Sequence, residues 1–269
     1  MEISSIEVIF EIGPFQFTNT IIWTWILMAA IVVGLALMAR KVSLVPSSKA
    51  QVVSELLVDT LNNLTRSTMG DNKMFFAPYM LALIVFLAIS NLSGFLFFGI
   101  VRPPTADWAT TLGLALLTFF MTQGFGIKSK GVGSWVKGFF EPVPFLVPLN
   151  IIGEIANPVS LSFRLFGNIL GGLIIMTLFY SIYVGSIPVI AWTCIGGLLL
   201  AIIVGINKFP KLKQMSKGKR TFVKLIGIIV LLPIFATSGA HFYFDLFSGL
   251  LQSFIFTMLS MVFISSAMD

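Results

Sequence analysis

Arg164 lies in the middle of a long apolar stretch of this chain. Residues 142–207 carry only two formal charges, Glu154 and Arg164. A guanidinium keeps its proton in apolar surroundings, and holding it at the centre of a bilayer costs between ~3 and ~15 kcal/mol. Such a residue is kept where it faces a counter-charge or a water-filled cavity. Two roles are therefore open for Arg164: a structural ion pair with Glu154 or Asp245, or a part in moving charge across a membrane.

The residues around Arg164 suit the close approach of a partner. At steps of three or four residues they share about one face of a helix, and they are Ser160, Gly167, Asn168, Gly171 and Gly172. Small residues let a second helix come near, and an asparagine can form hydrogen bonds in a wet cavity. Ordinary packing within the chain is the alternative for the glycines.

A second stripe of small and polar residues precedes the C-terminus. It comprises Asp245, Ser248, Gly249, Gln252, Phe256 and Ser260. A buried carboxylate can exchange protons near neutral pH, which suits Asp245 to a proton relay; a structural acid near the outer interface is the alternative. His241, one turn earlier, could extend that relay or lie at the interface. Elsewhere, Asp107 could be a helix N-cap or a charge at a channel mouth, and Gln123 is expected to form a helix-packing hydrogen bond.

The composition indicates an all-α integral membrane protein, a polytopic helical bundle. Hydrophobic residues make up 57% of the 269 residues, charged residues only 10%, and the mean hydropathy is +0.99. Soluble domains are about one quarter charged. The net charge of +6 does not indicate nucleic-acid binding, because the basic residues lie in loops beside apolar segments. The single cysteine, Cys194, excludes an internal disulfide, and we expect neither a cofactor nor a metal site.

Apolar stretches long enough to cross a bilayer alternate with short polar loops. They lie at 19–39, 75–99, 107–127, 187–206, 221–238 and 240–265, with a longer one at 143–184. Residues 48–69 are expected to form a cytoplasmic amphipathic helix at the interface, and residues 133–140 a shorter interfacial segment. The whole chain, 1–269, is expected to form one membrane domain. Residues 1–18 carry acids and no basic residue before the first span, which argues against a cleaved signal peptide and places the N-terminus outside.

The distribution of lysine and arginine predicts the topology. Cations gather in three regions: between the first two spans, after the third, and in a basic loop of seven cations at 208–224. If these regions are cytoplasmic, 15 of the 17 cations lie inside, and the C-terminus is cytoplasmic too. Residues 143–184 must then cross only once, although they could cross twice. We therefore expect one long helix there, strongly tilted or nearly horizontal, with a straight span along the bilayer normal as the alternative.

Two segments carry a resemblance to a known family. Residues 158–172 read Pro-Val-Ser-Leu-Ser-Phe-Arg164-Leu-Phe-Gly-Asn168-Ile-Leu-Gly-Gly, which resembles the segment of the F-type rotary ATP synthase a subunit that holds its essential arginine. Residues 245–260, from Asp245 through Gln252, resemble the last helix of the same family. Weaker likeness occurs at Asn-Leu-Ser-Gly, 91–94, and Pro-Thr-Ala-Asp, 104–107. The agreement covers most of the chain from about residue 75.

The resemblance implies a stator subunit packed against a ring of c subunits. Ions, H⁺ or Na⁺, would enter by one aqueous half-channel, ride the ring on a carboxylate and leave by an offset second half-channel. The tilted helices at 143–184 and 240–265 would form the ring interface, and the chain itself would bind no ATP. Peripheral stalk subunits of b type and the lipid bilayer are the other expected partners. A bacterial plasma membrane is the expected location.

The same resemblance implies roles for individual residues. Gln252 would lie opposite Arg164 and help to hold the guanidinium, while Asp245 would line the outer half-channel. Glu154, ten residues before the arginine, would line the inner half-channel, or be a simple interfacial acid. The small residues facing the ring would be Ser160, Gly167, Gly171, Gly172, Ser248 and Gly249. A fixed cation suits this task because it favours the ionised ring carboxylate and repels an ion that would pass directly between the half-channels.

Two departures from the family pattern stand out. Many bacterial relatives carry an acid nine residues beyond the arginine, where this chain has Leu173, so the outer path must depend on Asp245. Arg164 and Gln252 are also 88 residues apart, more than the compact family pattern implies. The excess lies at 187–238, which reads as an inserted hairpin with a basic cytoplasmic loop.

Two other classes of protein compete with the rotary stator. One is a secondary transporter or permease that holds an anionic substrate on Arg164, but no internal repeat or paired interrupted helices are visible. The other is a scaffold protein without transport activity, which would leave Arg164, Asp245 and Gln252 without a task.

Overall fold

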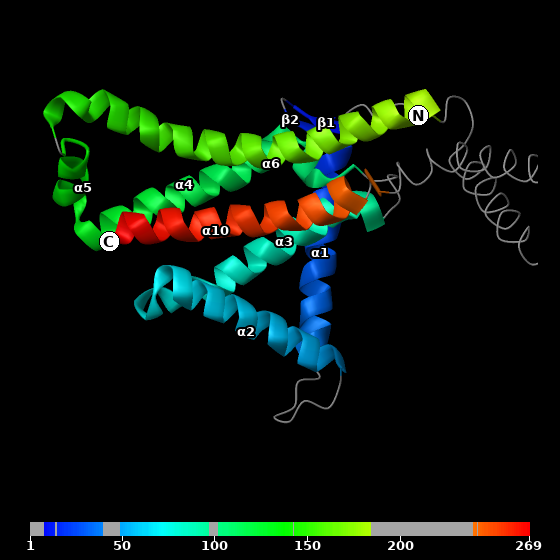
Figure 1. The fold of residues 1–269 in the computed structure, drawn as a ribbon, viewed down its shortest axis with the longest axis horizontal. Coiled ribbons are helices and arrows are strands. Elements are labelled where there is room, and N and C mark those ends of the chain that lie inside the picture. The colour runs from blue at the N-terminus through cyan, green and yellow to red at the C-terminus, as the bar shows by residue number, and fades with distance from the viewer. Residues whose placement is uncertain are drawn as a thin grey trace, which may run out of the picture. The chain divides into compact units, whose positions relative to one another are not determined.

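The computed structural model describes residues 8–13, 15–39, 49–96, 102–141, 143–183, 239–240 and 242–269. Helices dominate these residues (Figure 1), which confirms the polytopic helical architecture. Five helices in the described ranges are long and apolar enough to cross a membrane, and they cover Asn19–Leu37, Asp71–Gly94, Trp108–Lys130, Pro144–Leu178 and Phe242–Met268. The expected hairpin at 187–238 and His241 lie outside the described residues.

The helical elements follow the expected segments closely. The α-helices are α1 (Asn19–Ala39), α2 (Lys49–Met69), α3 (Ala77–Leu96), α4 (Trp108–Lys130), α5 (Val132–Gly138), α6 (Val147–Tyr183) and α10 (Gly249–Met268). Short 3₁₀ segments are η1 (Asp71–Phe76), η2 (Pro104–Ala106) and η3 (Pro144–Leu146), and η4 (Phe242–Ser248) is a π-helix. The chain divides into two compact units, residues 1–170 with 245–269, and residues 171–244.

A short hairpin precedes α1 and is the one departure from an all-α chain among the described residues. Strands β1 (Val8–Ile12) and β2 (Phe15–Thr18) pair antiparallel, with Glu11 opposite Gln16. Gly13, at φ 60°, provides the left-handed turn conformation that a side chain disfavours. β2 alternates between apolar and polar residues, and β1 begins with the β-branched or aromatic residues Val8, Ile9 and Phe10; both features favour strands over a helix.

The core of the first unit is built by α3, α4, α6 and α10. Each contributes apolar side chains that are at most 5% exposed, including Leu87 of α3, Ala115 of α4, Leu165 of α6 and Phe256 of α10. Along α6 the buried residues Leu161, Leu165 and Ile169 recur every four positions, the spacing that keeps one helix face toward its neighbours. On the opposite side of α6 the described side chains are exposed.

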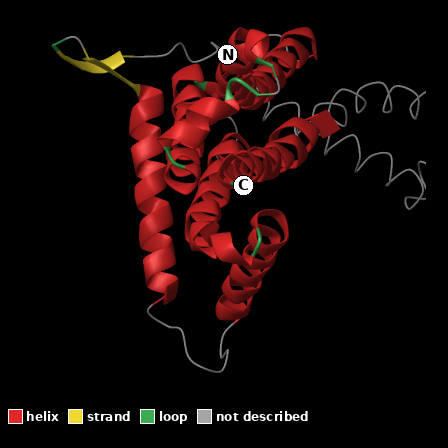
Figure 2. Ribbon diagram, turned by 90° about the vertical axis from the view of Figure 1, so that its left-hand side faces the viewer, coloured by secondary structure: helices red, strands yellow, loops and turns green. Residues whose placement is uncertain are grey.

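The long stretch at 143–184 forms a single helix, as expected. α6 runs for 37 residues without a turn, and Pro158 lies inside it. At 1.5 Å per residue this helix is roughly 55 Å long, while the hydrocarbon core of a bilayer is about 30 Å thick. In Figures 1 and 2, α1 runs steeply across the direction of α4, α10 and the first part of α6. If α1 crosses the bilayer along its normal, these helices lie close to the membrane plane.

The expected amphipathic helix at 48–69 is α2. Leu61 and Met69, in its second half, are buried in the subunit, while Val53 and Leu56 in its first half are more than 60% exposed. The apolar stripe is therefore shared between the protein core and an exposed face. The expected short segment at 133–140 coincides with α5.

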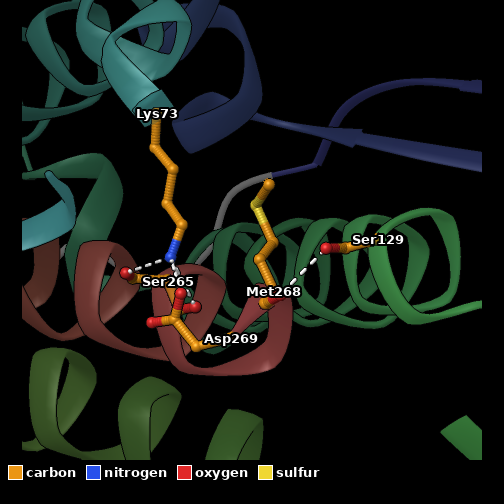
Figure 3. Close-up of polar contacts among 5 residues, drawn as sticks. All are labelled: Lys73, Ser129, Ser265, Met268 and Asp269. Carbon is orange, nitrogen blue, oxygen red and sulfur yellow. Dashed lines mark hydrogen bonds and ion pairs between the residues drawn. The ribbon is translucent and has the colours of Figure 1, made fainter. Parts of the chain in front are cut away.

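The C-terminal end of α10 is fastened by a buried lysine (Figure 3). The Lys73 ammonium donates hydrogen bonds to the Ser265 backbone carbonyl (3.1 Å) and to its hydroxyl (2.9 Å), and it forms an ion pair with Asp269. The Ser129 hydroxyl, near the end of α4, donates to the Met268 carbonyl at 2.8 Å. A cation at the negative end of a helix satisfies carbonyls that lack partners within the helix.

These contacts bring together segments that the cation count places on one side of the membrane. Lys73 belongs to the first basic region and Ser129 to the second, and both meet the end of α10. At the other end of these helices, the Thr20 hydroxyl at the start of α1 donates to the Asp107 carboxylate at the start of α4 (3.0 Å). The predicted topology requires this arrangement, because it places the two basic regions and the C-terminus on one side of the membrane.

Replacing Lys73 by methionine is expected to destabilise the subunit by about 1–3 kcal/mol, because hydrogen bonds from a charged donor to buried acceptors are lost. The measurement is the thermal midpoint of the subunit within the purified complex. Lys128→Met is the matched control, because Lys128 is exposed near the end of α4. Equal midpoints for the two variants would contradict the proposed fastening of α10.

Candidate ion-translocation site

Arg164 lies on the exposed side of α6. Its side chain forms no hydrogen bond and no ion pair with any residue in the described ranges. The structural pairing with Glu154 is not formed, because ten helical residues separate the two side chains by about 15 Å along the axis. Phe163 beside it is exposed, while Leu165 is fully buried. The helix therefore presents the guanidinium, without a counter-charge among the described residues, on a surface that those residues leave exposed.

The residues one turn away from Arg164 leave space around it. Ser160 and Gly167 are exposed. A Cβ atom added at Gly167 would meet no atom of the described residues within 4 Å. Gly171, which belongs to the second unit, is partly exposed. We call Ser160 and Gly167 together with Arg164 the open face of α6. Its small side chains would let another helix come close to the guanidinium.

Three residues expected on the ring-facing surface instead pack inside the chain. Gly172 is buried, and a Cβ there would lie 3.2 Å from the Cβ of Phe244. A Cβ at Gly249 would lie 3.2 Å from the Cβ of Asn91, and Ser248 is also buried. The prediction for these three is corrected, because their small size is used for close packing within this chain.

Asn168 joins α6 to the element before α10. Its side-chain amide donates to the Ser248 hydroxyl (2.7 Å), which in turn donates to the Asn168 carbonyl oxygen (2.9 Å). Asn168 lies one turn beyond Arg164 on α6. The pair fixes the part of α6 that carries the arginine against the start of the last helix.

Gln252 is buried among helices of its own chain. It is only 5% exposed, and Phe256 and Ser260 on the same stripe are fully buried. Its amide nitrogen has no hydrogen-bond partner in the described residues, and no hydrogen bond joins it to Arg164. A buried donor without a partner typically costs about 1–3 kcal/mol. Such a group calls for an explanation by a water, an ion or a partner chain.

Asp245 lies in the π-helical turn η4, before the regular helix α10. Its side chain is partly exposed. Single π-helical turns are rare and frequently occur at functional sites. The sequence does not predict this turn. A π-helical turn adds one residue to an apolar helix, and this leaves the amino-acid composition of the segment unchanged.

Glu154 is held in a chain of hydrogen bonds that links three helices. The Gln123 side-chain amide donates to the Glu154 carboxylate (2.7 Å), and the Trp135 indole N–H donates to the Gln123 carbonyl oxygen (3.0 Å). All three side chains are partly exposed. Gln123 thus makes the expected bond between helices, and its partner is the candidate acid of the inner path.

A small cavity adjoins Glu154 between α4 and α6. Its volume is about 10 Å³, and its polar lining comes from Thr118, Thr122, Glu154 and Asn157, so it has room for about one water. Pro158 also lines it. Because proline has no N–H, the backbone carbonyl of Glu154, four residues earlier, lacks its usual partner within the helix. The Glu154 carboxylate and this carbonyl provide polar partners for a water in a cavity whose lining is otherwise mostly apolar.

Asn91 is a site residue whose contacts sequence reasoning did not predict. Its amide donates to the Gly249 carbonyl and to the Ser253 hydroxyl, both at 2.9 Å, and its oxygen accepts from the Thr105 hydroxyl at 2.6 Å. The two weaker family-like segments, 91–94 and 104–107, therefore meet each other and α10. At the end of the second segment, Asp107 is the N-cap of α4, because it accepts from the Ala109 backbone N–H at 3.0 Å.

Comparison with known proteins agrees with this geometry. The family model described as "ATP synthase A chain" matches residues 21–265. The chain is 36% identical to "ATP synthase subunit a" of Moorella thermoacetica over 197 residues, which is 73% of this chain and 86% of the relative. It is 30% identical to "ATP synthase subunit a, sodium ion specific" of Propionigenium modestum over 266 residues, 94% of this chain and 75% of the relative. For the Bacillus subtilis subunit a, the identity is 31% over 262 residues, 93% and 91% of the two chains. The chain therefore belongs to the ATP synthase a subunit family and is an ion-translocating, non-catalytic stator component of the membrane sector of that complex.

Proposed function

We propose that the open face of α6 meets the ion-carrying carboxylates of a c-subunit ring and that Arg164 forces each arriving carboxylate to release its ion. The observation that carries this proposal is the exposed guanidinium, which has no partner in the described residues and small neighbours on its helix face. Coulomb attraction in a low-dielectric contact favours the ionised carboxylate. The same charge prevents a cation from crossing directly between the two aqueous paths, so that ion flow must turn the ring.

The inner path runs along the contact between α4 and α6. The water-sized cavity beside Glu154 supports this assignment, and so does the Thr111–Ser162 hydroxyl contact (3.4 Å), in which Ser162 lies two residues from Arg164. Hydroxyls and a carboxylate along one helix contact provide successive sites for water between the membrane surface and the arginine. Glu154 is the acid that exchanges ions with the cytoplasm in this scheme.

The outer path runs between α6 and the start of α10. Asp245 is its acid, and Asn168 and Ser248 provide hydrogen-bonding groups beside it. His241 is proposed to extend the relay. The Gln252 carbonyl oxygen, the only acceptor on that side chain, would take a hydrogen bond from the guanidinium once the ring is in place.

The subunit works within the assembled ATP synthase of a plasma membrane. We propose the c-subunit ring and b-type stalk subunits as its direct neighbours, with the N-terminus outside and the C-terminus in the cytoplasm. The translocated ion is H⁺ or Na⁺. The test is ATP-driven ion uptake by vesicles that contain the whole complex, with and without sodium. Normal uptake by a chain that lacks the Arg164 charge contradicts the proposal.

Asp245→Asn and Glu154→Gln are each expected to slow ATP-driven uptake by roughly tenfold or more, because a positioned acid is lost from one path and water replaces it only in part. The initial rate of uptake is measured at a series of pH values. Asp59→Asn and Glu141→Gln are matched controls, since both acids are exposed outside the proposed paths. A native rate and pH profile in either site variant would remove that acid from the path.

A further inference from the structure

We propose that Gln123 is a positioning residue for Glu154 and that Trp135, on α5, sets the direction of the Gln123 amide. This inference rests on the proposed function, in which Glu154 exchanges ions on the inner path. Without this role, Gln123 would be a helix-packing residue and Trp135 a residue of the short interfacial segment.

The direction of the amide follows from the chemistry of the indole. Trp135 Nε1–H can only donate a hydrogen bond, and it donates to Gln123 Oε1 at 3.0 Å. The amide nitrogen of Gln123 must then point the other way, where it donates to Glu154 Oε2 at 2.7 Å. A reversed amide would set a donor against the indole N–H and its oxygen against the carboxylate. Only one orientation of the amide satisfies both neighbours.

The connection between α4 and α5 brings the indole within reach. Gly131 caps the end of α4 with a φ of 79°, a conformation that favours glycine. The chain turns there, so Trp135 comes within hydrogen-bonding distance of Gln123, which precedes it by twelve residues. The Trp135 ring also packs edge-on against Phe139, with ring centroids 4.9 Å apart. The indole is thus held by its ring as well as by its N–H.

The consequence for Glu154 is a fixed carboxylate with one oxygen left over. Among the described residues, hydrogen bonds reach only its Oε2. Its other oxygen is available to the water that the adjoining cavity can hold. Gln123 therefore orients the Glu154 carboxylate and leaves its second oxygen toward the cavity, an effect that packing alone would not produce.

The test is a double-mutant cycle on ATP-driven uptake by the whole complex in vesicles. Gln123→Met keeps the length of the side chain and removes both polar groups. We expect it to slow uptake about tenfold in the native background. In the Glu154→Gln background, the same change is expected to alter the rate by less than about twofold. Trp135→Phe, which loses only the N–H, should slow uptake in the native background by less than Gln123→Met does.

A contact between α4 and α10 provides the control for a packing role. The Ser129 hydroxyl donates to the Met268 carbonyl at 2.8 Å, and Ser129 is exposed outside the proposed paths. Ser129→Ala removes that polar link between helices without touching Glu154, and its uptake rate should match the native one. A native rate for Gln123→Met would overturn the inference, as would an equal loss of rate in both backgrounds. A native rate for Glu154→Gln would instead refute the proposed inner path itself.

Discussion

Replacing Arg164 by alanine is expected to reduce ATP-driven ion uptake by two orders of magnitude or more, while the subunit still assembles into the complex. The loss of rate follows because no other cation in the described part of α6 can favour the ionised ring carboxylate; removing one preorganised electrostatic group typically costs about 10²–10³ in rate. Assembly survives because the guanidinium makes no hydrogen bond or ion pair with the described residues. Its removal therefore leaves no buried group without a partner.

The measurement is uptake by vesicles together with the amount of the subunit in the purified complex. Arg66→Ala is the matched control: Arg66 forms an exposed ion pair with Asp71 at 2.8 Å, and such surface pairs contribute at most about 1 kcal/mol. Arg164→Lys tests whether any cation suffices at this position or a permanent charge is needed, because a desolvated lysine can lose its proton where arginine cannot. Coupled uptake at the native rate in Arg164→Ala would refute the assignment of the open face.

The central features of the site could be predicted because they depend on costs that any membrane imposes. An arginine in an apolar stretch is expensive wherever it lies, so its presence alone indicates a functional task. The single long helix α6 was predicted from the cations on either side of it, since two crossings would have exposed the basic loop at 208–224 on the wrong side. Neither prediction depends on which helices are in contact.

The small residues that pack inside the chain share one physical cause. Periodicity shows that Ser248 and Gly249 lie on one face of the last helix, but it does not show what covers that face. Small residues serve a partner ring and an adjacent helix of the same chain equally well. Here the space is taken by Asn91 and Asn168. The same limit hid the link from Gln123 to Glu154, because a hydrogen bond between helices depends on their register.

Replacing Gly167 by leucine is expected to abolish coupled uptake without destabilising the subunit. A Cβ at this position meets no atom of the described residues within 4 Å, and leucine favours a helix over glycine by up to about 1 kcal/mol. The subunit should therefore be present in normal amount. The added side chain would occupy the space beside Arg164 that a ring helix needs, and overpacking an interface of small residues costs about 1–3 kcal/mol or prevents the close approach altogether.

The same substitution elsewhere in the chain separates these two effects. Gly113 of α4 is exposed, and a Cβ there also meets no atom within 4 Å in the part of the chain that the structure describes, so Gly113→Leu should leave both the amount of subunit and uptake unchanged. Gly172→Leu should lower the amount of folded subunit, because its Cβ would already lie 3.2 Å from that of Phe244. Uptake and subunit amount are measured for all three variants. If Gly167→Leu transported ions at the native rate, the open face of α6 would not be the surface that carries the ring, since a close helix contact cannot absorb a leucine in place of a hydrogen atom.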